Sequence, residues 1–123
     1  MTEYKLIDSS VWVRYLINEE YKDIIESEDI FYISSLSIFE VKKKLLKLNY
    51  KTQDILKSLE FIKKKCNILE VTKEISEEAA DISFNKNIGM ADSIIYITAI
   101  KNEAKLLTAD NDFRNLENTQ ILD

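Results

Sequence analysis

Four acidic residues far apart in this 123-residue chain have side chains of the type that hold a catalytic metal ion: Asp8, Glu40, Asp92 and Asp110. Each lies beside the predicted end of a strand or at the head of a helix. Two carboxylates about 4 Å apart repel each other by about 4 kcal/mol at an effective dielectric constant near 20. A cluster of four would therefore either take up protons or bind a cation.

The donor atoms that the chain offers restrict the kind of cation. There is no histidine and only one cysteine, Cys66. These counts exclude Ser-His-Asp and Cys-His catalysis and leave too few nitrogen and sulfur ligands for an ordinary zinc site. Oxygen ligands alone favour a hard ion, Mg²⁺ or Mn²⁺. Such an ion activates water, orients a phosphate and shields a departing oxygen, which is the chemistry of phosphodiester hydrolysis.

Each aspartate also has a structural explanation when it is considered alone. Asp8 can cap a helix or close an Asx turn, and Asp92 can cap the apolar helix that follows it. Asp110 and Asp112 can be ordinary turn residues. The joint placement of these acids is what the structural explanations do not predict, and it favours a shared site.

Glu40 has the strongest structural alternative. The segment Ser37–Glu40 has the pattern of a capping box, in which Glu40 reaches back to the N–H of Ser37. Glu40 can also pair with Lys44, four residues further along a helix. We favour a functional role because Glu40, like the aspartates, follows a strand of the predicted sheet.

The acids depend on an alternation of strands and helices for their positions. Strands are predicted at residues 4–7, 30–33, 67–71 and 105–108, with a short fifth at 121–122. Helices are predicted after Asp8, at 21–27, at 37–48, from a Thr52 cap to Lys65 and from Thr72. A last helix has Asp92 at its head and is apolar on nearly every side from residue 94 to residue 100. This alternation predicts one α/β domain over residues 1–123, with a parallel sheet of four to five strands flanked by helices. Ligands in such folds bind outside the carboxyl ends of the strands.

The net charge of −5 does not exclude a nucleic-acid substrate. Four of the negative charges would belong to the proposed site, and a bound cation would reverse the local sign. Lysine groups 42–44 and 63–65, with Arg14 and Arg114, are ordinarily solvated faces, although some can guide an RNA backbone. No apolar run approaches the roughly 20 residues that span a membrane, and the single cysteine fits a cytoplasmic protein.

Four segments together resemble the PIN-domain ribonucleases, and most of all the small VapC-type toxins of toxin–antitoxin pairs. They are Leu6-Ile7-Asp8-Ser9-Ser10, the helical Glu40, Ala91-Asp92-Ser93-Ile94-Ile95, and Leu107-Thr108-Ala109-Asp110-Asn111-Asp112-Phe113. The resemblance covers nearly the whole chain and implies a PIN-like three-layer fold. One departure is Tyr96-Ile97, where relatives usually carry small residues.

The resemblance also implies roles for individual residues. The matching acids Asp8, Glu40, Asp92 and Asp110 would hold Mg²⁺ or Mn²⁺, and Asp112 matches a further acid that assists in some relatives. Ser9 and Thr108 match hydroxyl positions that orient the site. The family further implies an RNA substrate, a homodimer and a cognate antitoxin protein.

Two other functions compete with a nuclease. A catalytically inactive PIN-like module would bind RNA or a partner protein and would bind Mn²⁺ weakly or not at all. A receiver-type phosphoacceptor domain shares the length, the α/β layout and an acidic Mg²⁺ pocket. It would need an acid at the end of the third strand and a lysine after the fifth. The third predicted strand ends Leu69-Glu70-Val71-Thr72, and the sequence shows only Asp123 after the fifth, so this alternative is the less favoured.

Overall fold

Five short strands form one parallel sheet in the computed structural model of the protein, which describes residues 4–123. The sheet order is β3-β2-β1-β4-β5, and every neighbouring pair is parallel. The predicted α/β class is confirmed, although residues 1–3 of the predicted domain lie outside the described residues. The strands are β1 (Tyr4–Ile7), β2 (Ile30–Ser34), β3 (Cys66–Leu69), β4 (Lys105–Thr108) and β5 (Thr119–Ile121).

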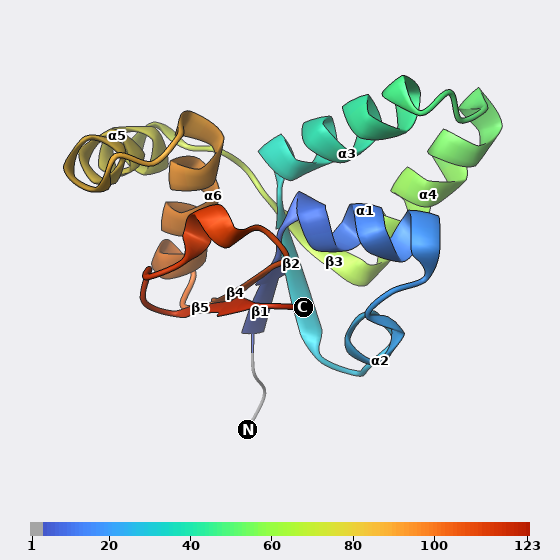
Figure 1. Ribbon diagram of the computed structural model, residues 1–123, viewed down its shortest axis with the longest axis horizontal. Coiled ribbons are helices and arrows are strands. Elements are labelled where there is room, and N and C mark those ends of the chain that lie inside the picture. Colours follow the sequence, from blue (N-terminus) through green and yellow to red (C-terminus); the bar gives the residue numbers. More distant parts are fainter. Residues whose placement is uncertain (1–3) are drawn as a thin grey trace.

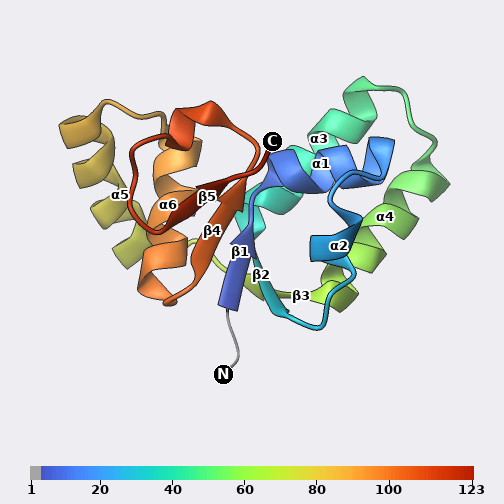
Figure 2. The ribbon, with the colours of Figure 1, turned by 60° about the horizontal axis from the view of Figure 1, so that its bottom comes forward.

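Helices cover both faces of this sheet and complete three layers (Figures 1 and 2). One face carries α1 (Ser9–Asn18), α2 (Lys22–Ile25), α3 (Ser35–Lys47) and α4 (Thr52–Lys65). The other face carries α5 (Lys73–Lys86) and α6 (Met90–Lys101), which pack against each other. A short 3₁₀ helix, η1 (Asn111–Phe113), follows β4. No helix within residues 4–123 is both long and apolar enough to cross a membrane.

Strands β1 and β4 contribute side chains to a separate hydrophobic core on each face of the sheet, because successive side chains of a strand point to opposite sides. Ile7 and Leu107 belong to the core beneath α1, α3 and α4. Leu6 and Leu106 belong to the core beneath α6. All four side chains are at most 1% exposed. The register Leu6–Leu106 and Ile7–Leu107 therefore fixes the carboxyl ends of β1 and β4 beside each other.

The strand order places a crevice between β1 and β4. The chain runs from β1 outward through β2 and β3, and then returns to the other side of β1 with β4 and β5. Open α/β sheets bind ligands where the strand order reverses, outside the carboxyl ends of the two strands concerned. The same order excludes the receiver-type alternative, whose sheet has the order 2-1-3-4-5.

Two predicted helix starts are wrong, and the caps explain why. Helix α3 begins directly after β2, because the Ser34 hydroxyl accepts a hydrogen bond from the Leu36 N–H at 3.2 Å. Thr52 is the first residue of α4 and not its cap, which is Lys51. The predicted cap of α5 is correct: the Thr72 hydroxyl accepts the N–H three residues further on. The third strand ends two residues earlier than predicted, at Leu69.

Asparagine replaces glycine in the turns of this chain, which contains one glycine and no proline. Four of the described residues with positive φ are asparagines, with φ between 54° and 72°. Asparagine tolerates this left-handed region better than other residues with a side chain. The single glycine, Gly89, has φ −66° and serves as the N-cap of α6. The four are Asn49, Asn87, Asn115 and Asn118.

Candidate active site

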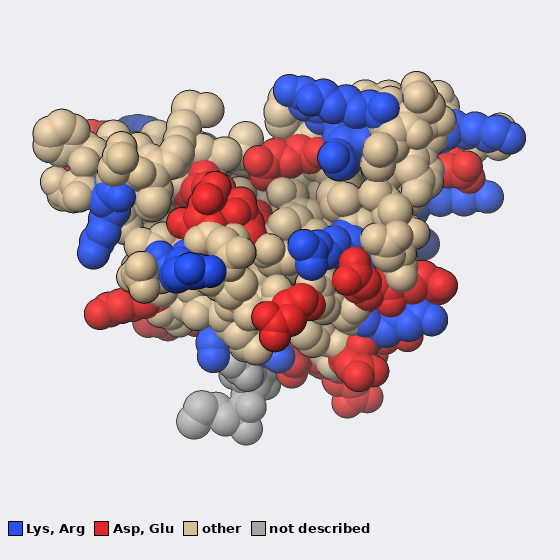
Figure 3. Space-filling model, viewed as in Figure 1, with Lys and Arg blue, Asp and Glu red and all other residues tan. Residues whose placement is uncertain are grey.

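Acidic side chains from four separate segments gather at the crevice between β1 and β4. Asp8 follows β1, Glu40 lies in α3, Asp92 lies in the first turn of α6, and Asp110 follows β4. Figure 3 shows acidic side chains grouped over the ends of α6 and β4, with a hollow between this group and the helices α1 and α3. The fold therefore brings together the four acids that the sequence analysis selected.

Asp8 is the most enclosed of these acids, at 4% exposure. It occupies the N-cap position of α1, but its side chain makes no capping hydrogen bond. Instead, its Oδ2 accepts hydrogen bonds from the Ser10 hydroxyl at 2.7 Å and from the Thr108 hydroxyl at 2.8 Å. The Asp8 side chain therefore does not cap α1, and its carboxylate is held by the two hydroxyls, while the backbone N–H groups of Ser9 and Ser10 also oppose the rise of its pKa.

The two hydroxyls that hold Asp8 also tie β1 to β4. Each has one proton, which it gives to Asp8, so the 3.2 Å approach between the two oxygens is not a hydrogen bond. Each hydroxyl accepts a backbone N–H in return: Ser10 from Ala109 at 2.9 Å and Thr108 from Asp110 at 3.0 Å. The sequence analysis selected Thr108 but missed Ser10, although its position two residues after Asp8 in a helical first turn was a usable signal.

Glu40 interacts with α1 and not with its own helix. Its Oε1 accepts a hydrogen bond from the Ser9 hydroxyl at 3.0 Å. The capping-box explanation is wrong because Ser34, not Ser37, caps α3. Glu40 and Lys44 also form no ion pair within 4.0 Å, as the ion pairs among residues 4–123 involve other side chains. Ser9 therefore holds the Glu40 carboxylate by a hydrogen bond, on the side of the acidic group that faces α1.

Three aspartates form the tightest part of the site. Asp92, Asp110 and Asp112 each place one carboxylate oxygen within 4.8 Å of the others. Asp92 does not cap α6, whose cap is Gly89. Asp110 does cap η1, because its Oδ1 accepts the Asp112 N–H at 2.9 Å. The turn explanation of Asp110 is thus correct, and the same turn carries Asp112 to the cluster.

Burial and mutual repulsion change the proton affinities of these acids. Burial is the main cause that raises the pKa of Asp92 to about 6, followed by repulsion from Asp110, Asp8, Asp112 and Glu40. Burial likewise raises the pKa of Asp8, although its hydroxyl partners oppose the change. The pKa of Glu40 is also raised, chiefly by burial, while the Ser9 hydrogen bond lowers it and repulsion raises it. The carboxylates of this group therefore have too little positive charge nearby to balance their negative charge.

The donor set fits a hard divalent cation. The oxygen ligands of an octahedral Mg²⁺ lie about 2.1 Å from the ion, so opposite oxygens are about 4.2 Å apart. The mutual limit of 4.8 Å for Asp92, Asp110 and Asp112 is close to that span. No sulfur competes: Cys66 is buried at the start of β3, and burial raises the pKa of its thiol to about 12.

Two aromatic residues of α1 belong to the core and not to the site. Trp12 is fully buried, and Tyr15 stacks on Phe61 of α4 with ring centroids 5.8 Å apart. Trp12 packs edge-on against both rings, at 6.0 and 6.2 Å. This packing places both residues in the contact between α1 and α4.

Several known structures have the same fold as this chain. A toxin–antitoxin complex from Klebsiella pneumoniae is similar to the chain, with a TM-score of 0.78, 21% identity, and coverage of 94% of this chain and 95% of that chain. The structure of VapBC2 from Rickettsia felis bound to a DNA fragment from its promoter gives a TM-score of 0.79 at 19% identity, covering 98% and 99%. VapC20 of Mycobacterium tuberculosis, described as a sarcin–ricin loop cleaving toxin, gives 0.70 at 12% identity, covering 89% and 92%.

The sequence itself matches a family model. Among curated proteins, no sequence matches the chain. The structural similarities, all at low identity, show a shared fold. The model of the PIN domain matches residues 5–118, which include all the acids of the site. The chain therefore belongs to the PIN domain family.

Proposed function

We propose that this PIN domain is a metal-dependent endoribonuclease and the toxin of a toxin–antitoxin pair. The observation that carries the proposal is the convergence of Asp92, Asp110 and Asp112 beside Asp8 and Glu40 at the crevice of the sheet. An antitoxin partner is supported by the toxin–antitoxin complexes among the similar structures. The RNA substrate and a cytoplasmic location follow from the resemblance to VapC-type toxins.

The acidic side chains would have different roles at this site. Asp92, Asp110 and Asp112 would hold Mg²⁺ or Mn²⁺, with Asp8 oriented toward the same ion by its two hydroxyl partners. When bound, the ion supplies an activated water and neutralises charge on the phosphate oxygens. Glu40 would orient the attacking water, because Ser9 occupies Oε1 and leaves Oε2 for a proton. Attack in line on phosphorus breaks the bond to the 3′ oxygen and leaves a 5′-phosphate on the product.

Cleavage of RNA tests this proposal. We expect the wild-type protein to cut a single-stranded RNA with Mg²⁺ or Mn²⁺ under single-turnover conditions and to leave 5′-phosphate ends. Asp8→Asn and Asp92→Asn should each lower the rate by at least about 100-fold, since even the outer partners of metal ligands typically contribute about 10–100-fold. Asp54→Asn, which changes an exposed acid of α4, is the matched control. A wild type that binds no Mn²⁺ and cuts no RNA would instead support an inactive binding module.

The pKa of Asp92 predicts an unusual dependence of stability on pH. Between its ordinary value of 3.8 and its folded value of about 6, the folded protein holds a proton that the unfolded chain has released. The free energy of unfolding of the metal-free protein should therefore fall as the pH rises through this interval. The raised pKa values of Asp8 and Glu40 act in the same direction.

Urea unfolding in EDTA between pH 4 and 7.5 measures this effect. Asp92→Asn should flatten the decline partly, because Asp8 and Glu40 remain, whereas Asp54→Asn should leave it as steep as in the wild type. Added Mn²⁺ should restore stability at pH 7.5, because the ion binds the folded site. A wild-type stability that rises steadily with pH across this interval would contradict the proposed charge crowding.

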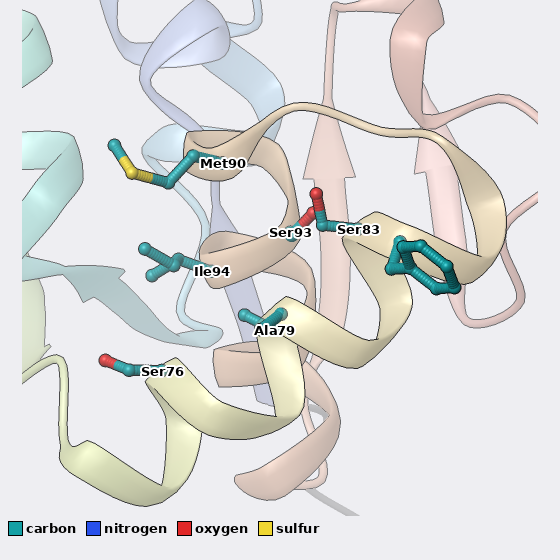
Figure 4. Close-up of a pocket in the computed structure, with 8 residues that line it drawn as sticks. Ser76, Ala79, Ser83, Met90, Ser93 and Ile94 are labelled. Atoms are coloured by element: carbon teal, nitrogen blue, oxygen red, sulfur yellow. The ribbon is translucent and has the colours of Figure 1, made fainter.

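We also propose a homodimer that forms through an apolar groove between α5 and α6 (Figure 4). The groove has a volume of about 540 Å³ and is bordered by Phe84, which is 88% exposed, and by Met90, which is 73% exposed. Two large apolar side chains exposed beside one apolar groove favour a contact with a protein partner. A projecting ring beside a groove on one face provides both halves of a two-fold symmetric contact. The groove is lined from α5 by Ser76, Ala79 and Ser83, and from α6 by Met90, Ser93 and Ile94.

Sedimentation of a charged variant tests the dimer. Phe84→Lys places a charge in the proposed contact and should convert the dimer to a monomer. Leu56→Lys changes an exposed apolar residue of α4, outside the groove, and should leave the dimer intact. A monomeric wild type at tens of micromolar, or a Phe84→Lys protein that stays dimeric, would rule out this interface.

A further inference from the structure

The two flanks of the acidic group differ in chemistry. Toward α5 and α6 the exposed neighbours are apolar, as the groove at Phe84 and Met90 shows. Toward α1 and α3 they are basic, and Figure 3 shows Lys and Arg side chains over both helices on that side of the hollow. A protein with 22 acidic and 17 basic residues thus places cations next to its densest group of carboxylates.

A depression between α1 and α3 joins these cations to the acidic site. It has a volume of about 340 Å³, at the small end of the range for ligand pockets. Glu40, one of the site acids, lines it. Ser9 and Ser10, which donate hydrogen bonds to Glu40 and to Asp8, line it as well. Arg14 and Lys44 also line it, together with Val13. The depression is therefore continuous with the place where a scissile phosphate would lie.

The basic surface continues outward along α3. A second depression of about 220 Å³ shares Glu40 and Lys44 with the first and extends to Phe39, Lys43 and Lys47. A strand that leaves the acidic site in this direction would pass from carboxylates to ammonium groups within two turns of one helix.

Neither cation of the first depression has a carboxylate partner among the described residues. The ion pairs of residues 4–123 are Lys5–Asp29, Lys22–Glu19 and Lys101–Glu78. The Arg14 guanidinium donates a hydrogen bond to the Tyr21 hydroxyl at 3.0 Å, and that hydroxyl donates to the Asp123 carbonyl at 2.9 Å. Arg14 is thus held in place by a neutral group and retains its charge for an external anion.

We propose that Arg14 and Lys44 form a subsite for the phosphate next to the one that is cut, so that the RNA strand leaves the active site across α1 and α3. This inference rests on the proposed ribonuclease function and assigns the direction of its substrate. The two residues act as positioning residues: they bind the backbone, read no base, and hold the neighbouring phosphate while the acids act on the scissile one.

Single-turnover cleavage of one RNA oligonucleotide at several enzyme and salt concentrations tests the subsite. Replacing one cation that contacts a phosphate of a single strand with a neutral residue should lower the slope of log affinity against log salt by about 0.7. The enzyme concentration at half-saturation should then rise about fivefold at 0.1 M salt. Arg14→Gln and Lys44→Gln should each show this change, and the double variant about twice the change in slope. Arg14→Lys and Lys44→Arg should restore most of the salt dependence, because both retain the charge.

Lys42→Gln is the matched control, because Lys42 is an exposed cation of α3 that borders neither depression. It should leave half-saturation and its salt slope as in the wild type. If wild type cuts RNA but Arg14→Gln and Lys44→Gln match it, or if Lys42→Gln weakens binding equally, the subsite is wrong while the ribonuclease stands. If wild type cuts no RNA with Mg²⁺ or Mn²⁺, the proposed function and the subsite both fall.

Discussion

Repulsion among carboxylates that the fold forces together is the constraint on which this site depends. Burial first, and then repulsion from three aspartates and a glutamate, raise the pKa of Asp92 to about 6. Such a cluster persists only because the surrounding structure is stable enough to hold it. Asp8 illustrates the support: two hydroxyls hold one of its oxygens, and both hydroxyls are themselves fixed by backbone N–H groups of the β4 end. A divalent cation would relieve the repulsion and complete the site.

The order of the strands explains why acids so distant in sequence can meet. The chain reverses its direction of travel through the sheet between β1 and β4, so the loops after these strands diverge and leave a crevice. Asp8 follows β1 directly and Asp110 follows β4 after one residue, and the buried pairs Leu6–Leu106 and Ile7–Leu107 fix the register of the two strands. Helix α3 brings Glu40 from one face, and α6 brings Asp92 from the other. The site thus uses both layers of helices, and its flanks differ: basic side chains of α1 and α3 lie on one side and the apolar groove beside Phe84 and Met90 on the other.

Much of this arrangement could be predicted from the sequence, because the strands and the acids obey strong local rules. The apolar runs at β1 and β4 and the cap at Thr72 were predictable from residue types alone. The start of α3 was not, since Ser34 and Ser37 are equally good caps by type and only the end of β2 decides between them. The role of Glu40 was also ambiguous, because its partner Ser9 lies on another helix, 31 positions away in the sequence. Ser10 could have been found from its position two residues after Asp8, whereas Asp112 was expected only from the family resemblance, because its approach to Asp92 and Asp110 depends on the geometry of η1.

The crowded aspartates share a divalent ion in the proposed mechanism, and every other role at the site depends on that ion. Anomalous diffraction from crystals grown with Mn²⁺ measures this directly. The account predicts a single strong peak, or a close pair, among carboxylate oxygens of Asp92, Asp110 and Asp112, with Asp8 turned toward it. Crystals that contain Mn²⁺ but show no anomalous density at this crevice, or show it only elsewhere on the surface, would contradict the claim.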